Sequence, residues 1–190
     1  MNVFRTSSLA LVTVLLGVTM TLHAQQEPQL DLAVTYIADH SLKAATEQHF
    51  WMEGGSIQLG ANAFRGWGIA ADVTGTHSSS IGNSGIPVSL VTATFGPRYR
   101  WHAQKKLSIY GEVLAGEANG FKSLYPNQFG SQSSTNGLAL QIGGGMDYKL
   151  KKHLAIRLLD AAWTRTQLSN ATDNVQNLLR LGAGIVVCFN

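Results

Sequence analysis

The feature that most constrains this chain is an alternation of apolar residues with small or charged ones at every second position. It is plain in the last segment, "LLRLGAGIVVCFN", which spans residues 178–190. Leu179, Leu181 and Ile185 fall on one face of an extended strand. Arg180 and Gly182 fall on the other face. The pattern therefore predicts a strand with one face in an apolar medium and the other in a polar one.

Eight segments of this kind recur along the chain, whereas helical periodicity is hard to find. They lie near residues 30–39, 50–62, 66–76, 87–101, 106–118, 135–149, 153–166 and 175–189. The connections after the second, fourth and sixth segments are short, and the others are longer. This alternation of turns and loops is typical of outer-membrane barrels, with the short turns on the periplasmic side. The sequence predicts an all-β fold, an eight-stranded antiparallel up-and-down transmembrane β-barrel.

The seventh segment, "LAIRLLDAAWTRT", breaks the alternation. Arg157 and Asp160 have opposite parity, so a regular strand would direct them to opposite faces. Both can face the interior only if the strand carries an extra residue. We therefore expect a β-bulge near Leu158 and Leu159.

The first 24 residues have the layout of a secretory signal peptide. Arg5 precedes an uncharged apolar stretch at residues 9–22, and Ala24 supplies the small residue before a cleavage site. The apolar stretch is short for a membrane helix, which needs about 20 residues. We expect a cleaved signal peptide at residues 1–24, a barrel at 25–190, and localisation in the outer membrane of a Gram-negative-type bacterium.

Composition excludes several other classes of protein. The chain has 14 Lys and Arg against 11 Asp and Glu, and a net charge of +3 is too weak to predict a nucleic-acid partner. Its single cysteine, Cys188, excludes an intramolecular disulfide. The histidines lack metal-ligand spacing, so no metal or other cofactor is expected.

The charged residues are predicted to fill the barrel interior. An eight-stranded barrel has room inside for side chains only, and an arginine facing lipid near the midplane costs about 2–4 kcal/mol. Glycines on the same face leave space for the long arginine side chains. We therefore expect a filled polar interior with a balanced charge network of Asp31, Asp72, Arg98, Arg100, Glu112, Asp147, Arg157, Asp160 and Arg180.

Outward-facing aromatic residues are predicted to form two girdles at the membrane boundaries, where amphipathic rings are favoured. The expected periplasmic girdle consists of Trp67, Tyr99, Trp101, Tyr148 and Phe189. The expected exterior girdle consists of Tyr36, Trp51 and Trp163.

Beyond the exterior girdle, a long loop at residues 119–135 carries Phe121, Tyr125 and Phe129 among small polar residues. It is the best candidate for contact with an extracellular ligand.

Four stretches carry a resemblance to a known family: "FGPRYRW", "IYGEVLAGEANGF", "GGGMDYKLKKHLAIRLLDAAWT" and "LRLGAGIVV". In this order they resemble acidobacterial outer-membrane β-barrel proteins, which are similar to the membrane domain of outer-membrane protein A. The resemblance is good over residues 90–190 and implies a barrel inserted by the outer-membrane assembly machinery. The chain departs from the family in two places. A Gln-x-Asp-Tyr-like stretch is replaced at residues 160–163, and Asn190 follows the terminal aromatic Phe189.

The sequence thus favours a non-enzymatic, monomeric barrel in outer-membrane lipid, with a structural or surface-interaction role such as adhesion or envelope integrity. One alternative is a soluble exported ligand-binding barrel of the lipocalin type, which would place apolar residues inside. A small pore is a second. An outer-membrane hydrolase is a third, because His77 precedes three serines, Ser78 to Ser80, and Asp39 and Glu47 are expected on a neighbouring loop.

Overall fold

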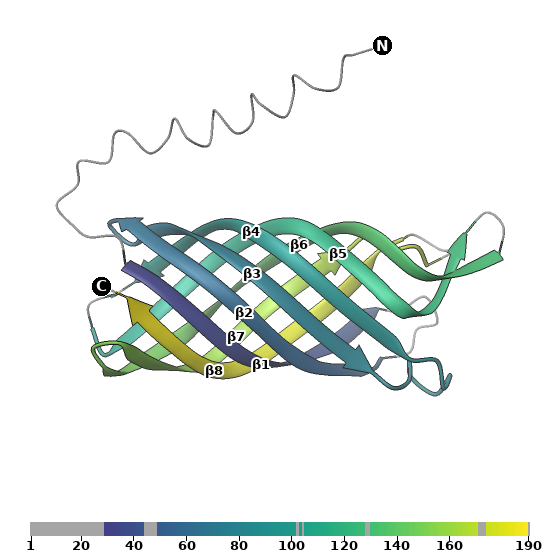
Figure 1. The fold of residues 1–190 in the computed structure, drawn as a ribbon, viewed down its shortest axis with the longest axis horizontal. Helices are drawn as coiled ribbons and strands as arrows, with labels where there is room; N and C mark the ends of the chain where they lie inside the picture. The colour runs from purple at the N-terminus through teal and green to yellow at the C-terminus, as the bar shows by residue number, and fades with distance from the viewer. Residues whose placement is uncertain are drawn as a thin grey trace, which may run out of the picture.

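The computed structural model describes residues 29–43, 49–101, 103, 105–127, 130–170 and 174–189. The expected signal peptide, residues 1–24, lies outside the described residues. Eight antiparallel strands close into one barrel, in which each strand pairs with its neighbours in the chain and β1 pairs with β8 (Figure 1). The strands are β1 (Gln29–Lys43), β2 (Trp51–Phe64), β3 (Trp67–Ser78), β4 (Val88–Trp101), β5 (Leu107–Asn127), β6 (Gly130–Lys151), β7 (Leu154–Thr166) and β8 (Gln176–Phe189).

The prediction of an all-β, eight-stranded antiparallel barrel is confirmed. The described part of the chain has no helix of the length and apolar character needed to cross a membrane.

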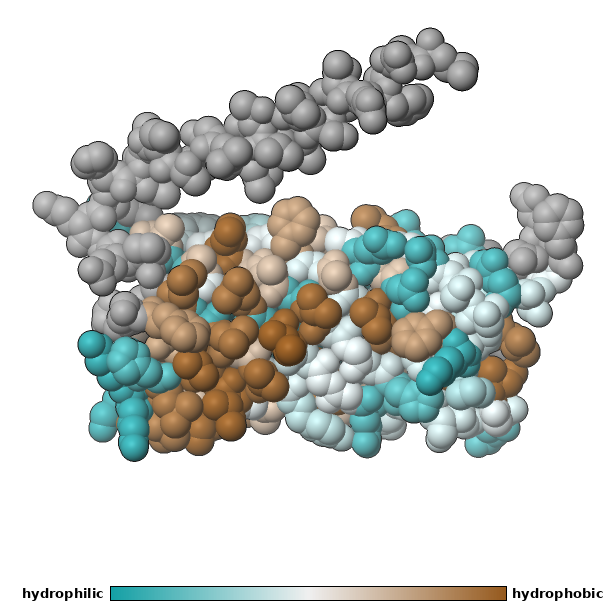
Figure 2. Space-filling view, viewed as in Figure 1, coloured by the Kyte–Doolittle hydropathy of each residue, from teal (hydrophilic) through white to brown (hydrophobic). Residues whose placement is uncertain are grey.

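The strands direct their apolar side chains outward and their charged ones inward. Phe95 is 73% exposed on the outer face of β4, whereas Arg98 on the same strand is 0% exposed. On the visible side, apolar side chains gather toward the end that carries the short turns (Figure 2). This parity suits lipid outside and polar side chains inside, and it is the reverse of a lipocalin-type barrel.

An apolar band on the outer face ends at a ring of polar residues. In β6 the outward residues are apolar or small from Leu138 to Tyr148, and the next outward position is Asn136. In β5 the band starts at Leu107 and ends before Glu117. Spans of about 9–11 residues per strand are what a tilted membrane strand needs. The barrel therefore continues past the apolar band at the end opposite the short turns.

The predicted bulge in β7 is confirmed. The pairing of β7 with β8 shifts register between Arg157 and Asp160, and Leu158 and Leu159 are both exposed on the outer face. The extra residue turns Arg157 and Asp160 to the same side. Both side chains are buried inside the barrel.

The prediction of a long loop at residues 119–135 is wrong. β5 and β6 continue as a paired hairpin, with Asn119 opposite Asn136 and Asn127 opposite Gly130. We call residues 119–135 the outer hairpin; it projects beyond the other strands (Figure 1). The pairing shifts register between Phe121 and Tyr125. Where the two strands pair, their backbone groups bond to each other, so these strands form without apolar alternation. Of the three aromatics predicted there, Phe129 lies outside the described residues.

We expect that replacing Ile185 by Arg destabilises the inserted barrel. Ile185 faces outward near the middle of the apolar stretch of β8, so the charge would meet the hydrocarbon at a cost of about 2–4 kcal/mol. Urea unfolding from lipid vesicles measures this loss. The control Ile185→Ala should lose less, and equal losses for both variants would contradict the assigned outer face.

Candidate functional site

The barrel interior is filled by charged side chains from seven strands. The nine residues predicted for the interior charge network are each at most 8% exposed. They lie on β1, β3, β4, β5, β6, β7 and β8: Asp31, Asp72, Arg98, Arg100, Glu112, Asp147, Arg157, Asp160 and Arg180.

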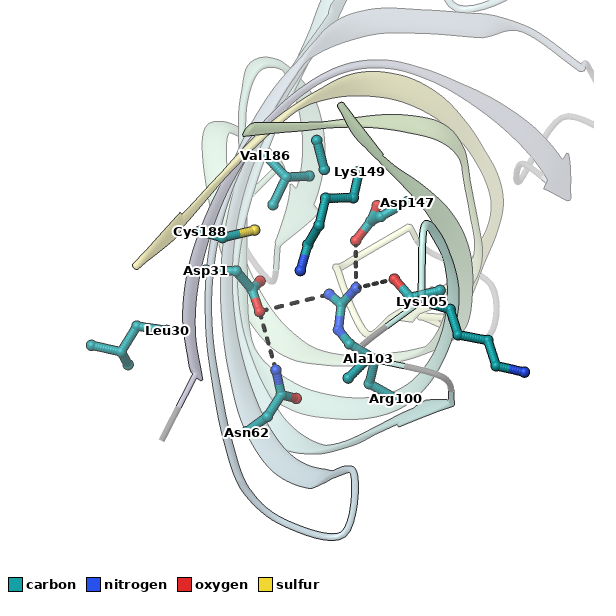
Figure 3. A pocket seen from close by; sticks show the side chains of 12 residues that line it. Leu30, Asp31, Asn62, Arg100, Ala103, Lys105, Asp147, Lys149, Val186 and Cys188 are labelled. Atoms are coloured by element: carbon teal, nitrogen blue, oxygen red, sulfur yellow. Dashed lines mark hydrogen bonds and ion pairs between the residues drawn. The ribbon is translucent and has the colours of Figure 1, made fainter. Parts of the chain in front are cut away.

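At the short-turn end, two arginines of β4 reach Asp31 of β1. Arg98 makes two hydrogen bonds to the Asp31 carboxylate, one of them from Nη1 to Oδ1 at 3.0 Å. Arg100 lies 3.6 Å from the same carboxylate and donates to Asp147 Oδ2 at 2.8 Å. Figure 3 shows the Arg100 guanidinium between the two carboxylates. These contacts join β1, β4 and β6 across the interior.

Arg157 makes the largest number of side-chain hydrogen bonds among the arginines here. Its Nε donates to Asp147 Oδ1, and its Nη1 donates to Asp160 Oδ2, each at 3.0 Å. The same Nη1 also donates to Gln58 Oε1 at 3.0 Å, and the Gln58 amide donates to Glu112 at 2.8 Å. The guanidinium thereby connects β7 with β6 and, across the lumen, with β2 and β5.

Tyr110 of β5 lies among three guanidinium groups. The Cζ atoms of Arg157, Arg100 and Arg98 lie 4.6, 5.3 and 5.8 Å from the centre of its ring. The Tyr110 hydroxyl donates to Asp160 Oδ2 at 2.6 Å. An aromatic face attracts cations most where water is excluded, so the ring stabilises the packed arginines.

Arg180 forms a separate group nearer the outer end. Its Nη1 donates to Asp72 Oδ1 at 3.1 Å, and its Nε lies 3.6 Å from Asp39 Oδ1. Asp72 also accepts from Thr74 at 2.6 Å. One cation from β8 therefore holds carboxylates of β1 and β3, the strands on the far side of the closing seam.

The residues of the hydrolase alternative are not brought together. Asp39, which that alternative assigned to a loop, is buried in β1 and paired with Arg180. His77 is exposed, and its Nδ1 shares a hydrogen bond of 2.9 Å with Ser89 rather than with the serines that follow it. Glu47 lies outside the described residues. The hydroxyls of Ser78 and Ser80 instead donate to the backbone carbonyls of Ser80 and Gly82.

Sequence reasoning did not assign Asp39, Gln58 and Tyr110 to the network. Parity contained the signal, because Tyr110 shares the face of Glu112, and Gln58 lies on the inward face of "GSIQLG". Among the described residues, no group of three or more His, Cys, Asp or Glu side chains is arranged to hold a metal ion.

Gly60 of β2 provides the space for Arg98. A Cβ atom at this position would overlap the Arg98 guanidinium. Gly60 is paired with Asp31 of β1, so the missing side chain leaves room for the guanidinium beside the carboxylate that it contacts.

The aromatic residues lie near the two edges of the outer face. At the short-turn end, Trp67, Tyr99 and Trp101 form edge contacts, with ring centres 5.0 and 4.5 Å apart. Tyr148 and Phe189 lie exposed near the same end of β6 and β8. Trp51 and Trp163 occupy the outer portions of β2 and β7. Tyr36 lies at the midpoint of β1, opposite Gly55 and one outward position inside the level of Glu53.

What this arrangement can do is hold strands together and occupy the lumen. Ion pairs cross the interior at several heights, and the cavity beside Asp31 and Arg100 at the short-turn end measures only about 30 Å³, room for about two or three waters. A closed barrel with lipid-compatible outer walls and paired internal charges defines the class of integral outer-membrane β-barrel proteins.

Comparison with known families agrees with this assignment to the outer-membrane β-barrel proteins. The model described as "Outer membrane protein beta-barrel domain" matches residues 9–186, and the chain belongs to this family. The protein localises to the outer membrane of Gram-negative bacteria. Among curated proteins, none matches the sequence.

Solved outer-membrane barrels share the fold. Ail, the attachment invasion locus protein of Yersinia pestis, in complex with the heparin analogue sucrose octasulfate, is 17% identical with a TM-score of 0.57; the match covers 86% of this chain and 100% of Ail. Neisserial surface protein A is 15% identical with a TM-score of 0.58, over 85% of this chain and 97% of that one. OprG from Pseudomonas aeruginosa is 10% identical with a TM-score of 0.54, over 87% and 97%.

Replacing Arg98 by Leu should cost about 3–5 kcal/mol of unfolding free energy, because Asp31 would stay buried without its main partner. Urea titration of the folded barrel measures this cost. In the double variant with Asp31→Leu, the loss should be smaller than the sum of the two single losses. Strictly additive losses would contradict the pairing, and the exposed control Lys152→Leu, in the short turn after β6, should change stability by less than about 0.5 kcal/mol.

Replacing Gly60 by Ala should destabilise the barrel by about 1–3 kcal/mol, since the added methyl group displaces the Arg98 guanidinium. The matched control is Gly75→Ala on neighbouring β3, where the nearest atom to a new Cβ is Val91 Cγ2 at 3.9 Å. The same urea titration should show little change for the control. Equal tolerance of both alanines would exclude a spacing role for Gly60.

Proposed function

We propose that the protein is a non-enzymatic, monomeric barrel that presents the outer hairpin for interaction with a partner outside the cell. The observation that most supports this proposal is the length of two strands. β5 has 21 residues and β6 has 22, whereas the other strands have 12–15. The additional residues lie past the apolar band, where lipid contact cannot account for them.

The filled interior supports a role in presentation rather than conduction. Arg157 and Tyr110 occupy the lumen in the half of the barrel nearer the short turns, and both are buried among partners from several strands. An ion crossing the barrel would have to break these buried pairs, which is costly. We therefore propose a barrel without a steady pore.

The character of the outer hairpin indicates the chemistry of its partner. Ail binds a polysulfated sugar analogue, but the outer hairpin here carries Lys122 as its only charged residue and is otherwise rich in Ser, Gln and Asn. A polyanion needs several cations. The composition supports a partner recognised by hydrogen bonds and apolar contact, such as an uncharged glycan or a protein surface.

The proposal also includes export by a signal peptide at residues 1–24 and insertion of residues 25–190 by the outer-membrane assembly machinery. The charge of Arg5 ahead of the apolar stretch at 9–22 supports export. The stretches at residues 90–190 support a place within the acidobacterial branch of the family.

Shortening the outer hairpin should abolish the surface interaction while keeping the barrel. Phe121 lies opposite Ser134, so replacing residues 122–133 by Asn-Gly would close the strands with a two-residue turn. We expect cells producing this variant to lose most of the surface attachment conferred by the wild-type protein, measured by retention on glycan-coated and protein-coated wells.

Two controls accompany this test. The shortened barrel should keep its heat-modifiable migration on gels, which reports folding. Two single-cysteine variants in a Cys188→Ser background test the orientation. The exposed Ser133→Cys should react with a membrane-impermeant maleimide on intact cells, whereas Lys105→Cys should react only after permeabilisation. Unchanged attachment by a folded, shortened barrel would overturn the proposal.

A further inference from the structure

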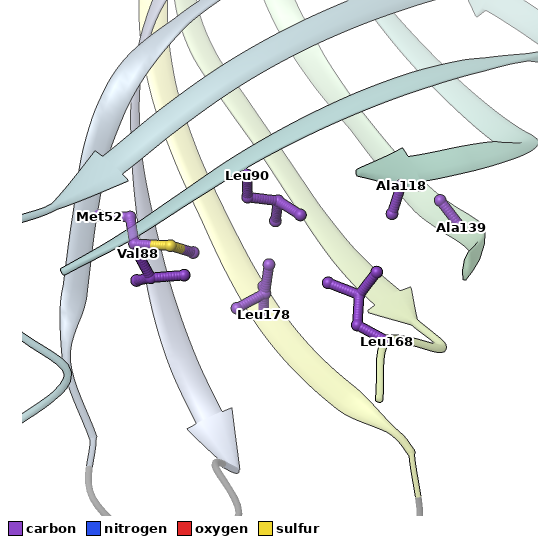
Figure 4. Close-up of a cluster of buried hydrophobic side chains, with 7 residues drawn as sticks. All are labelled: Met52, Val88, Leu90, Ala118, Ala139, Leu168 and Leu178. Atoms are coloured by element: carbon purple, nitrogen blue, oxygen red, sulfur yellow. The ribbon is translucent and has the colours of Figure 1, made fainter. Parts of the chain in front are cut away.

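Inside the outer end of the barrel, the filling changes from charged to apolar. Met52, Val88, Leu90, Leu168 and Leu178 form a buried cluster there. Figure 4 shows these side chains converging on the lumen from β2, β4, β8 and the segment after β7. Met52 lies beside outward-facing Glu53, and Leu178 lies one inward position outside Arg180. The cluster therefore lies at or beyond the edge of the apolar band, separated from lipid by the strands.

A cavity of about 310 Å³ opens above this cluster. Its size lies in the range of small-molecule sites, and it is about twice the 150 Å³ cavity that holds a benzene molecule in another protein. The walls come from the outer ends of the strands, the outer hairpin and the segments after β3 and β7. The described residues that line it are apolar or neutral polar, and none is charged.

Hydrogen bonds hold the walls of the cavity in place. Gln176 accepts from the backbone of Leu168 at 3.0 Å and donates to its carbonyl at 2.9 Å, which fixes the segment after β7. Ser169 Oγ donates to the Pro126 carbonyl at 2.6 Å and ties this segment to the outer hairpin. A site that is ordered before binding loses less entropy when a ligand enters.

Tyr125 lines the cavity, but its hydroxyl has almost no accessible surface and lacks a hydrogen-bond partner among the described residues. The residue as a whole is 8% exposed. The hydroxyl lies over Gly120, where a Cβ would overlap it, and beside Leu168. Burial raises the pKa of Tyr125 to about 12, so the group stays protonated and can donate. A buried hydroxyl without a partner is costly. A ligand oxygen that displaces the Leu168 side chain beside this hydroxyl would satisfy it.

We propose that this outer cavity binds a small uncharged molecule with an apolar body of about two rings and one hydrogen-bonding oxygen, which contacts the Tyr125 hydroxyl. The apolar cluster holds the rings, and the absence of charge from the described lining selects against ions. The base of the cavity is closed by the Arg180 group with Asp39 and Asp72. The site is therefore a pocket that is closed at its base and does not continue through the barrel.

The test uses the barrel in lipid nanodiscs with 6-fluoro-2-naphthol and 2-fluoronaphthalene as probes, followed by fluorine NMR against empty nanodiscs. We expect saturable binding of both probes, with one site per barrel. Tyr125→Phe should weaken the naphthol by about 2- to 10-fold, the range for one neutral hydrogen bond, and leave 2-fluoronaphthalene unchanged. Val88→Trp, which fills the cavity, should abolish binding of both.

The control Val113→Trp adds the same side chain on the lipid-facing side of β5 and should bind like the wild type. Uptake no greater than in empty nanodiscs would overturn the proposal, as would equal weakening of both probes by Tyr125→Phe. If Val88→Trp fails to fold, the Tyr125→Phe comparison still decides. Both variants keep the length of the outer hairpin, so a failure here is distinct from a failure of the attachment test.

Discussion

The Arg157 guanidinium joins carboxylates of β6 and β7 to the Gln58 amide of β2, across the lumen of the barrel. A cation removed from both water and lipid is tolerated only with such partners. Much of the surrounding architecture serves this kind of contact. The β7 bulge turns Arg157 and Asp160 to the same side, and the bare backbone of Gly60 leaves room for a neighbouring guanidinium. The outer face carries apolar residues, because charged side chains of the strands point inward and pair there.

Parity alone was enough to predict much of this fold. A one-residue slip in a strand exchanges its two faces, so charges such as Arg180 that cannot face lipid report which face is inside. The same reasoning located the bulge at Leu158 and Leu159 from nothing more than the spacing of Arg157 and Asp160. The signal is strong because the penalty for error, a charge in hydrocarbon, is large.

What parity could not predict depends on the third dimension. Arg98 pairs with Asp31 and Arg180 with Asp72, residues 67 and 108 positions apart, because register and strand tilt bring them to the same height. The outer hairpin lies beyond the membrane, where alternation no longer marks a strand. Parity likewise assigns Met52 and Leu178 to the inward face. It does not predict the height along the barrel at which the interior becomes apolar.

The contacts of Arg180 bear on how the barrel is completed. This cation lies on the last strand, while the two carboxylates that it holds lie on the first and third. A curved sheet without β8 would leave Asp39 and Asp72 with an uncompensated negative charge and an open edge on β1. Pairing of β8 with β1 removes both defects at once. Partly assembled sheets keep the unpaired carboxylates and the open edge, so the contacts of Arg180 favour the closed barrel over them.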